Sequence, residues 1–413
     1  MKVLLMAYAC APDRGSEPGL GWGWATTLAG LGHDVCVVTR ASSRPAIEAA
    51  LTARPQPRLT VVYHDLPPWA RRLKARFGGL ATRAYYLAWM RSVTPRLREL
   101  AATGRFDVAH HVTFAQYWSG TALDSLDLPL LWGPVGGGEP CEAAFWPGLG
   151  WRGATYEALR RLLPRLAEHR PALRRLAGRC RLAVATTPET AERMRAIGAA
   201  SVMLQSQVAL APETLNQLAS SSAGDGGTSV AGTGLRLVAL GPLLPHKGLH
   251  LALAALAKVA GDWHLEVIGD GPQRARLARL ADDLGIGARV TFVGRLPQAE
   301  AHRRLARSHA LIFPALHDSG GFAVAEAMAA GLAIVCLRRG GPAQLVPDEA
   351  GIKVAAATPD EAVAGLASAI TSLVADPPRC AALGRVGRSH AVRNFLWPTR
   401  ATALYDRFLK APQ

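Results

Sequence analysis

The sequence predicts an α/β protein of two domains, each with a parallel sheet covered by helices. The chain has 413 residues, whereas a domain of average size holds about 150. Short β-branched apolar runs alternate along the whole chain with longer stretches rich in Ala, Leu and Arg. Because strands separated by helices and apolar on both faces are typical of parallel sheets, both halves are predicted to be α/β.

Strands are expected where short apolar runs end in turn residues. In the first half these runs are Val3–Ala7, Asp34–Thr39, Leu59–Tyr63, Val108–His111, Leu130–Trp132 and Leu182–Thr186. In the second half they are Arg236–Leu240, His264–Ile268, Val290–Val293, Ala310–Pro314 and Ala333–Leu337. Ligands of open parallel sheets bind beyond the carboxyl ends of the strands, so functional residues are expected in the loops that follow these runs.

A low-complexity stretch divides the chain near its middle. Residues 219–234 consist almost entirely of Ala, Ser, Gly and Thr, which is the composition of a flexible linker. The first domain is therefore expected over residues 1–218, and the second is expected to begin at residue 235.

Composition argues against several classes of protein. No apolar stretch approaches the roughly 20 residues that cross a bilayer. The run Val3–Cys10 could be taken for a signal peptide with Cys10 as a lipid-attachment site, but it is short and reads better as a first buried strand. The six cysteines lie far apart with no C-x-x-C pair, so neither a metal cage nor a disulfide framework is expected. A reducing, cytoplasmic location fits this pattern best.

The chain is strongly basic, with 47 Lys and Arg against 31 Asp and Glu and a net charge of +16. Such a charge attracts polyanions, but no nucleic-acid-binding module is recognisable, so a nucleic-acid partner is not expected. Arginines interleaved with leucines between Leu159 and Arg181 predict a pair of basic amphipathic helices. Two interpretations stay open: the pair lies on an anionic membrane surface, or its leucines pack on the core.

The strongest local pattern follows the run Ala310–Pro314. Asp318 precedes a turn that contains Gly320 and Gly321, and Glu326 lies about one turn into the helix that follows. Free N–H groups at a helix start bind anions, so a phosphate group is expected here. Carboxylates bind hydroxyl groups, and a sugar nucleotide carries both hydroxyls and phosphates. The alternative is a capped helix with one buried acid.

Two further loops of the second half favour the same ligand. Lys247 lies just ahead of a helix, where its ammonium can reach a diphosphate. Gly269 and Gly271 form a tight turn that lets the backbone approach a ligand closely. This turn lacks the full G-x-G-x-x-G pattern, so a nicotinamide or flavin site is weakly supported.

Four motifs follow one another in the second half. They are G-x-L-x-x-x-K-G (Gly241–Gly248), G-D-G-P with a following L-x-x-L (Gly269–Leu280), V-T-F-V-G-R-L (Val290–Leu296) and acid-x7-E (Asp318–Glu326). In this order and spacing they resemble the donor-binding domain of glycosyltransferase family 4. The first half resembles the acceptor domain of that family through the glycine-rich segment Gly15–Trp22, the pair His110 and His111, and the segment Gly133–Glu139.

The resemblance implies the GT-B fold, in which two Rossmann-like domains have parallel sheets that face a central cleft. The nucleotide-sugar-binding domain would cover residues 235–392. A final helix over residues 393–413, with Asn394–Trp397 at its start, would cross back to the first domain.

The resemblance also implies roles for residues of the second half. Glu326 would hold the ribose, and Lys247 would neutralise the leaving diphosphate. The donor sugar and diphosphate would contact Asp318 and the backbone of Gly320, Gly321 and Phe322. The loop with Gly269 and Gly271 would lie beside the donor, and Arg295 and Leu296 would face the base.

In the first half, Gly15 and Ser16 would approach the donor, and His111, in preference to His110, would lie near the reacting carbon. Two positions depart from the family pattern. Pro242 stands where the family often has an arginine, so one cationic contact is missing. Asp318 stands where the family often has a glutamate, so the carboxylate reaches less far.

The activity implied is a retaining hexosyl transfer from a UDP or GDP sugar to a glycan or lipid-linked acceptor, as in bacterial polysaccharide, glycolipid or cell-envelope synthesis. No Asp-x-Asp signature is present, so no metal or other cofactor is expected. Location would be cytoplasmic, with the basic helices on the inner face of the plasma membrane. The alternatives are an epimerase or phosphorylase of the same fold and a non-catalytic polyanion-binding protein.

Overall fold

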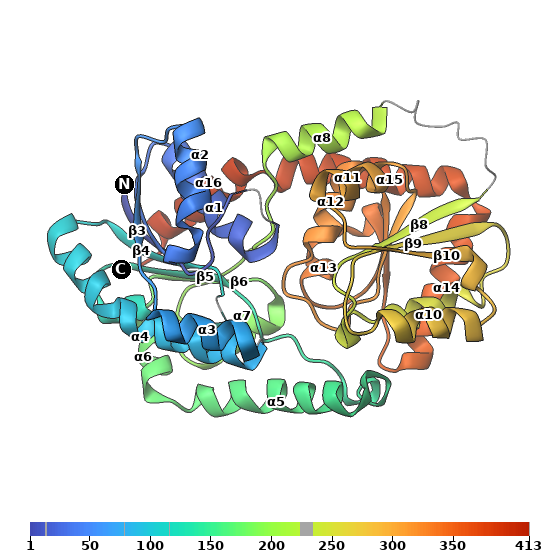
Figure 1. Cartoon of the computed structure of the whole chain (residues 1–413), viewed down its shortest axis with the longest axis horizontal. Helices are drawn as coiled ribbons and strands as arrows, with labels where there is room; N and C mark the ends of the chain where they lie inside the picture. Colours follow the sequence, from blue (N-terminus) through green and yellow to red (C-terminus); the bar gives the residue numbers. More distant parts are fainter. Residues whose placement is uncertain (13–14, 78, 115, 224–233, 413) are drawn as a thin grey trace. The chain divides into compact units, whose positions relative to one another are not determined.

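The computed structural model describes residues 1–12, 15–77, 79–114, 116–223 and 234–412. Contacts divide the chain into two compact units (Figure 1). Unit 1 comprises Met1–Gly138, Leu163–Gln207 and Trp397–Gln413, and unit 2 comprises Glu139–Leu162 and Val208–Leu396.

This division differs from the boundaries expected at residues 218 and 235. Residues 139–162 of the first half pack within unit 2, and so do residues 208–218. Of the expected linker, residues 219–223 are the end of helix α8 (Pro212–Ala223), and residues 224–233 lie outside the described part of the chain.

Unit 1 contains a seven-stranded parallel sheet in the order β3-β2-β1-β4-β5-β6-β7. Its strands are β1 (Lys2–Ala7), β2 (Asp34–Thr39), β3 (Leu59–Tyr63), β4 (Val108–Val112), β5 (Leu130–Val135), β6 (Leu182–Ala185) and β7 (Val202–Leu204). The six predicted strands are confirmed. The run that begins at Val3 forms the buried strand β1, as predicted in preference to a signal peptide. Sequence reasoning missed β7 because it is a three-residue edge strand.

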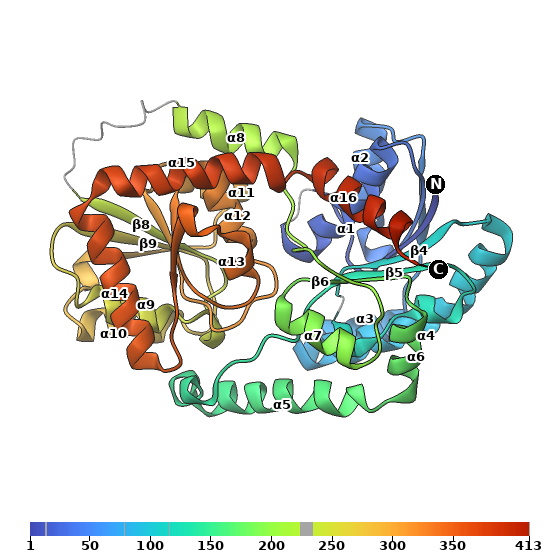
Figure 2. The same cartoon turned by 180° about the vertical axis from the view of Figure 1, so that it is seen from behind.

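Helices cover both faces of this sheet (Figures 1 and 2). One face carries α1 (Ser16–Gly30), α2 (Arg44–Ala53) and α16 (Trp397–Lys410), and the other carries α3 (Pro68–Phe77), α4 (Gly79–Gly104), α6 (Pro171–Arg179) and α7 (Pro188–Ala196). Helix α16 packs on α1, where a Cβ added to Gly23 would lie 2.3 Å from the Trp397 ring. Only glycine permits this contact, so the last helix of the chain is part of the core of unit 1.

Unit 2 contains a six-stranded parallel sheet in the order β10-β9-β8-β11-β12-β13. Its strands are β8 (Leu235–Leu240), β9 (Trp263–Ile268), β10 (Val290–Gly294), β11 (Ala310–Phe313), β12 (Ala333–Leu337) and β13 (Gly351–Val354). The five predicted strands are confirmed. The sixth, β13, escaped prediction because its sequence Gly-Ile-Lys-Val has no continuous apolar run.

Alternate residues of these strands point into two cores. Leu237, Val267 and Ile312 face α9 (Leu249–Leu256), α10 (Arg274–Asp283) and α14 (Pro359–Ala375). Val238 and Leu311 face α8, α11 (Gln298–Ala306), α12 (Phe322–Ala330) and α15 (Pro377–Asn394). Both faces of the sheet are therefore buried, as its apolar strands predict.

Two helices begin at the same local signal, a threonine followed by proline. The Thr358 hydroxyl accepts from the N–H of Glu361 at the start of α14, and the Thr187 hydroxyl accepts from the N–H of Thr190 at the start of α7. The hydroxyl satisfies an N–H that has no partner within the helix, and the proline presets the first helical φ angle.

The two arginine-rich helices behave differently. In α6, Leu173 and Leu176 are buried in the core of unit 1, so the core-packing interpretation is confirmed for this helix. In α5 (Gly150–Glu168), by contrast, Leu159, Leu162 and Leu166 are exposed. Across the described residues, every helix is too short or too polar to traverse a lipid bilayer.

Candidate active site

The strand order of unit 2 reverses between β8 and β11. The chain leaves β8 toward β9 on one side and leaves β11 toward β12 on the other. Loops diverge at such a point, and open parallel sheets bind their ligands in the crevice that this leaves. The loops after β8 and β11 carry Lys247 and Asp318, so sheet topology places both predicted residues at the expected edge of the unit.

Lys247 and Asp318 form an ion pair, with Nζ 2.6 Å from Oδ2. The other carboxylate oxygen, Oδ1, accepts a hydrogen bond of 2.9 Å from the N–H of Gly320. Burial raises the pKa of Asp318, but the charge of Lys247 and the hydrogen bonds from Lys247 and Gly320 outweigh it and hold the pKa below its usual value. Asp318 is therefore ionised at neutral pH, and it fixes the Lys247 ammonium at the start of α12.

The start of α12 leaves N–H groups free for a ligand. Its N-cap residue, Gly321, has a φ angle of 94°, a left-handed conformation that glycine adopts without strain. Among the residues that the structure describes, no side chain caps this helix. The helix ends at Gly331, as expected, with a φ angle of 85°. The N–H groups and the positive end of the helix dipole, close to Lys247, make an anion site.

The turn before α12 is held by two glycines that sequence reasoning missed. The N–H of Gly341 donates to the backbone oxygen of Asp318 over 2.7 Å. A Cβ on Gly341 would lie 2.6 Å from the backbone oxygen of Ser319, and one on Gly340 would lie 2.4 Å from that of Asp318. The signal that could have revealed this contact is the Gly-Gly-Pro sequence two residues after a predicted strand.

Glu326 lies on α12, one turn after Phe322, with about a sixth of its side chain exposed. Its Oε1 is 3.5 Å from Nε2 of His302 on α11, and the side chains are 16 % and 5 % exposed. Glu326, the residue predicted to bind the ribose, is thus a largely buried carboxylate with a neighbouring imidazole.

Gly269 and Gly271 pack the loop after β9 against the loop after β8. A Cβ on Gly269 would lie 1.9 Å from the backbone oxygen of Gly241, and one on Gly271 would lie 2.5 Å from that of Leu243. The N–H of Leu243 also donates to the backbone oxygen of Asp270. The structure gives these glycines a packing role that supports the loop leading to Lys247.

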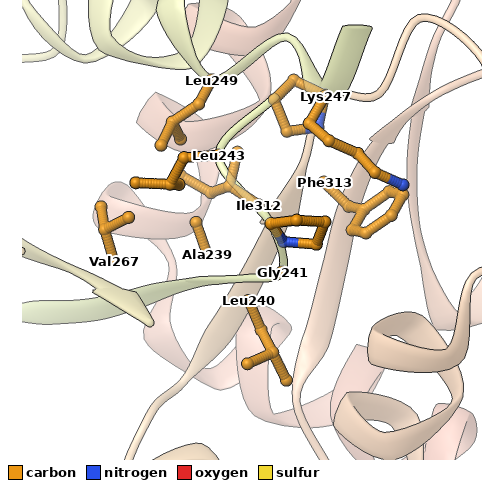
Figure 3. A pocket seen from close by; sticks show the side chains of 11 residues that line it. Ala239, Leu240, Gly241, Leu243, Lys247, Leu249, Val267, Ile312 and Phe313 are labelled. Carbon is orange, nitrogen blue, oxygen red and sulfur yellow. The ribbon is translucent and has the colours of Figure 1, made fainter. Parts of the chain in front are cut away.

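A hollow lies beside Lys247 at the carboxyl ends of β8 and β11 (Figure 3). Its lining is largely apolar and includes Leu240, Pro242, Leu243, Ile312 and Phe313. The Lys247 ammonium is 5.6 Å from the centre of the Phe313 ring. Pro242 thus contributes an apolar wall where an arginine was expected. Arg295 is exposed just after β10, and Leu296 beside it is partly buried against the core.

In unit 1, both histidines of β4 are completely buried. His110 uses both ring nitrogens within the unit, because Nδ1 is 3.0 Å from the Tyr405 hydroxyl and Nε2 is 2.8 Å from the backbone oxygen of Gly133. His111 Nε2 lies 3.3 Å from the Tyr86 hydroxyl. Burial lowers the pKa of His110 to about 4 and that of His111 to about 3, so both rings are neutral at neutral pH.

The strand order of unit 1 reverses between β1 and β4. After β4, Thr113 and Phe114 both have left-handed φ angles, 63° and 52°, which are uncommon for these residue types. The N–H of Phe114 donates to Glu17 over 2.8 Å, and the Thr113 hydroxyl accepts from the N–H of Ala9. These two hydrogen bonds stabilise the strained turn. The turn lies at the same sheet edge as the exposed Gly15 and as Ser16, the first residue of α1.

Comparison with known proteins finds a family similarity in the second half of the chain. Residues 229–390 match the family model of glycosyl transferases group 1. Over these residues the second half of the chain is similar to a glycosyl transferase group 1 domain. This domain carries Lys247, Asp318 and Glu326, the residues that the resemblance to family 4 singled out.

Curated relatives match the same part of the chain. The GDP-mannose-dependent alpha-(1-6)-phosphatidylinositol monomannoside mannosyltransferase of Mycolicibacterium smegmatis is 32 % identical over 180 residues, which cover 41 % of this chain and 46 % of the relative. The glycogen synthase of Mycobacterium tuberculosis is 31 % identical over 179 residues, which cover 42 % of each chain. The match therefore spans less than half the length of these relatives.

Solved structures match nearly the whole chain. Sucrose-phosphate synthase from Thermosynechococcus elongatus has a TM-score of 0.69 at 19 % identity and covers 99 % of this chain and 98 % of its own. WaaG, a glycosyltransferase involved in lipopolysaccharide biosynthesis, has a TM-score of 0.60 at 17 % identity and covers 97 % and 98 %. Anabaena Alr3699/HepE in complex with UDP has a TM-score of 0.63 at 16 % identity, with 99 % and 100 % covered. The predicted GT-B fold is confirmed.

Proposed function

We propose that this protein is a retaining glycosyltransferase. It transfers a hexosyl group from a nucleoside diphosphate sugar to a hydroxyl of a glycan or lipid-linked acceptor in bacterial envelope or polysaccharide synthesis. The observation that carries the proposal is the Lys247–Asp318 pair at the uncapped start of α12, at the point where the strand order of a group 1 domain reverses.

The donor diphosphate binds at the start of α12. The N–H groups of Gly321 and Phe322 and the Lys247 ammonium stabilise the negative charge that grows on the diphosphate as the glycosidic bond breaks. Asp318 and Glu326 accept hydrogen bonds from hydroxyl groups of the sugar and the ribose. Because these groups are placed before the donor binds, little reorganisation is needed during the reaction.

The acceptor binds to unit 1, at the edge that carries Gly15 and the strained turn after β4. His111 lies closer to this turn along the chain than His110 and takes the role near the reacting carbon. A diphosphate oxygen removes the proton of the acceptor hydroxyl on the face from which the diphosphate departs. This route needs no enzymic nucleophile and accounts for retention of configuration.

Thermal unfolding with UDP, GDP and ADP tests the donor site directly. A nucleotide present at about 100 times its dissociation constant adds roughly 2.7 kcal/mol to stability, so the preferred base identifies itself. Names of relatives support UDP or GDP, since one is GDP-mannose-dependent and Alr3699/HepE was crystallised with UDP. Equal stabilisation by all three nucleotides, or by none, contradicts the proposal.

The reaction itself is tested by incubating the preferred nucleotide sugar with and without acceptor glycolipid. Transfer with an unchanged anomeric configuration, and full activity in chelator, are the expected results. In the described residues, no group of three His, Cys, Asp or Glu side chains is placed to hold a metal ion. An epimerised sugar formed without acceptor would favour the epimerase, and activity that depends on added manganese would refute metal independence.

We further propose that α5 contacts an anionic membrane surface on the cytoplasmic side. Trp151, Leu159, Leu162 and Leu166 are exposed by 75, 47, 51 and 57 %, and they repeat at helical spacing. Exposed Arg152, Arg161 and Arg165 accompany them and can pair with anionic headgroups.

Sedimentation with lipid vesicles tests this surface. The protein should sediment with vesicles that contain phosphatidylglycerol and should stay in the supernatant with pure phosphatidylcholine vesicles. Leu159→Ser combined with Leu162→Ser should release it. Leu409→Ser, at an exposed leucine of α16, is the matched control. Equal binding by the double variant and the control would contradict the role of α5.

A further inference from the structure

One part of unit 2 comes from the first half of the chain. The segment Glu139–Leu162 leaves the loop after β5 and packs against the helices and strands of unit 2. Cys141, Phe145 and Leu149 are buried in the same core as α9 and β8. The first part of α5 follows, and its Glu157 points inward, with the carboxylate only 2 % exposed.

Glu157 contacts the residue next to Asp318. Its Oε1 lies 2.7 Å from Nε2 of His317, and the His317 side chain is 8 % exposed. Burial lowers the pKa of His317 well below its usual value. Burial raises the pKa of Glu157, and the charge of Arg160 opposes that rise. In its ionised form Glu157 only accepts hydrogen bonds, and a neutral ring carries one N–H, so the ionised pair has the proton of His317 on Nε2.

The rings of His246 and His317 stack, with centroids 4.5 Å apart and planes 15° apart. The next residue after each histidine is a member of the Lys247–Asp318 ion pair. The N–H of Leu316 also donates to the backbone oxygen of His246 over 2.8 Å. The two loops are therefore joined by a backbone hydrogen bond, a ring stack and an ion pair over consecutive residues.

Helix α5 contacts both histidines. The rings of Tyr156 and His246 stack, with centroids 6.4 Å apart and planes 23° apart, and Glu157 binds His317. Arg160 holds Glu157, since Nη1 is 3.8 Å from its Oε2, and Nη2 is 3.0 Å from Oε2 of Glu139. Both carboxylates are thus buried beside one guanidinium, which supplies the charge that a buried acid requires.

We propose that Glu157 is a positioning residue of the donor site. By accepting the Nε2 proton of His317 it fixes the tautomer and orientation of that ring, and through the ring stack it fixes the Lys247 and Asp318 side chains on their loops. Glu157 itself contacts neither of these two residues by hydrogen bond or ion pair in the described part of the chain. The kinetic part of this inference rests on the proposed transferase function.

Nitrogen NMR of isotope-labelled histidine tests the first step without substrate. Wild-type His317 should show the Nε2–H tautomer alone, and Glu157→Ala should change it to a mixture of tautomers. Glu157→Gln should retain the wild-type signal, because its amide oxygen still accepts the proton. An unchanged His317 signal in Glu157→Ala overturns the proposal. Since no substrate is needed, this result is independent of whether the protein is a transferase.

Kinetics test the second step. Glu157→Ala should lower kcat by about 100-fold, the size expected when a charged group is displaced by about 1 Å. KM for the donor should change less, and Glu157→Gln should recover most of the rate. Glu192→Gln, which alters an exposed carboxylate of α7, is the control and should keep the wild-type rate. A wild-type rate in Glu157→Ala overturns the proposal.

A double variant separates positioning from a general loss of folding. If Glu157 acts through His317, Glu157→Ala combined with His317→Ala should lose no more activity than His317→Ala alone. Losses that multiply would show that the two residues act independently and would overturn the proposal. Nucleotide-induced stabilisation of each variant reports whether unit 2 remains folded.

Discussion

His110 on β4 accepts a hydrogen bond of 3.0 Å at Nδ1 from the hydroxyl of Tyr405 on α16, across 295 residues of sequence. Burial raises the pKa of Tyr405 well above its usual value, so the hydroxyl stays protonated and donates. His110 Nε2 donates in turn to the backbone oxygen of Gly133. Through Nδ1 His110 thus joins the last helix to the sheet of unit 1, and through Nε2 it binds the neighbouring strand β5.

Removing this hydroxyl should destabilise the protein. In Tyr405→Phe, the buried Nδ1 of His110 loses its donor, and an unsatisfied buried polar group costs about 1–3 kcal/mol. Urea unfolding of wild type and variant measures the difference. Tyr156→Phe, which alters an exposed tyrosine, is the control. Equal stability of the two variants would show that the His110 contact contributes nothing.

Lys247→Ala should lower transfer by about 100-fold or more, the size seen when one group that stabilises transition-state charge is removed. Asp318→Ala and Glu326→Ala should also lower transfer strongly. Steady-state kinetics with the donor identified by thermal unfolding provide the measurement. Lys258→Ala removes an exposed lysine of unit 2 and should leave the rate of transfer unchanged. Near-normal transfer by Lys247→Ala would remove charge stabilisation from the mechanism.

Gly341→Ala should disturb the turn before α12. The new Cβ would meet the backbone oxygens of Ser319 and Gly320 at 2.6 and 2.7 Å, so the backbone has to move. We expect a loss of about 1–3 kcal/mol in stability, the usual cost of overpacking, together with weaker nucleotide binding. At Gly30, on α1, a Cβ would meet no atom within 4 Å, so Gly30→Ala is the matched control. A fully active Gly341→Ala would mean that the turn tolerates the shift.

Gly15→Ala separates a structural role from a substrate contact. Gly15 has a φ angle of −68°, which alanine adopts freely, and a Cβ there would meet nothing within 4 Å. Stability should therefore stay unchanged. If the backbone at Gly15 approaches the donor, transfer should fall at least tenfold because the methyl group occupies that space. Unchanged kinetics would place the donor elsewhere.

The buried neutral histidines should make stability depend on pH. Burial holds the pKa of His111 and of His246 near 3, against 6.5 in the unfolded chain. Between pH 6.5 and about 3 the unfolded state therefore binds more protons, so stability falls as pH falls. Each such ring contributes about 1.4 kcal/mol per pH unit across that window.

Urea unfolding at pH 7 and pH 5 measures this dependence. His111→Asn should reduce the loss of stability between the two values by the contribution of one ring. His169→Asn, at an exposed histidine, is the control and should follow the wild type. An unchanged dependence in His111→Asn would mean that the ring is protonated in the folded state.

Local sequence patterns predicted the parts of the site that lie on one loop or helix. The turn at Gly320, the helix end at Gly331 and the strands before them follow from glycine positions and apolar runs. The contact between Lys247 and Asp318 depends on β8 and β11 being neighbours, which only the strand order reveals. The Glu157–His317 bond joins residues 160 positions apart, and nothing in either local sequence indicates it.

The segment Glu139–Leu162 and helix α16 each complete a unit to which most of the surrounding sequence does not belong. During synthesis, the core of unit 1 stays incomplete until Trp397 and the residues after it have been made, which is after all of unit 2. Residues 139–162 likewise lack their packing partners until the strands of unit 2 have been made. Each unit therefore lacks part of its core until a segment distant in the sequence has been synthesised, and the apolar surface that this segment covers stays exposed until then.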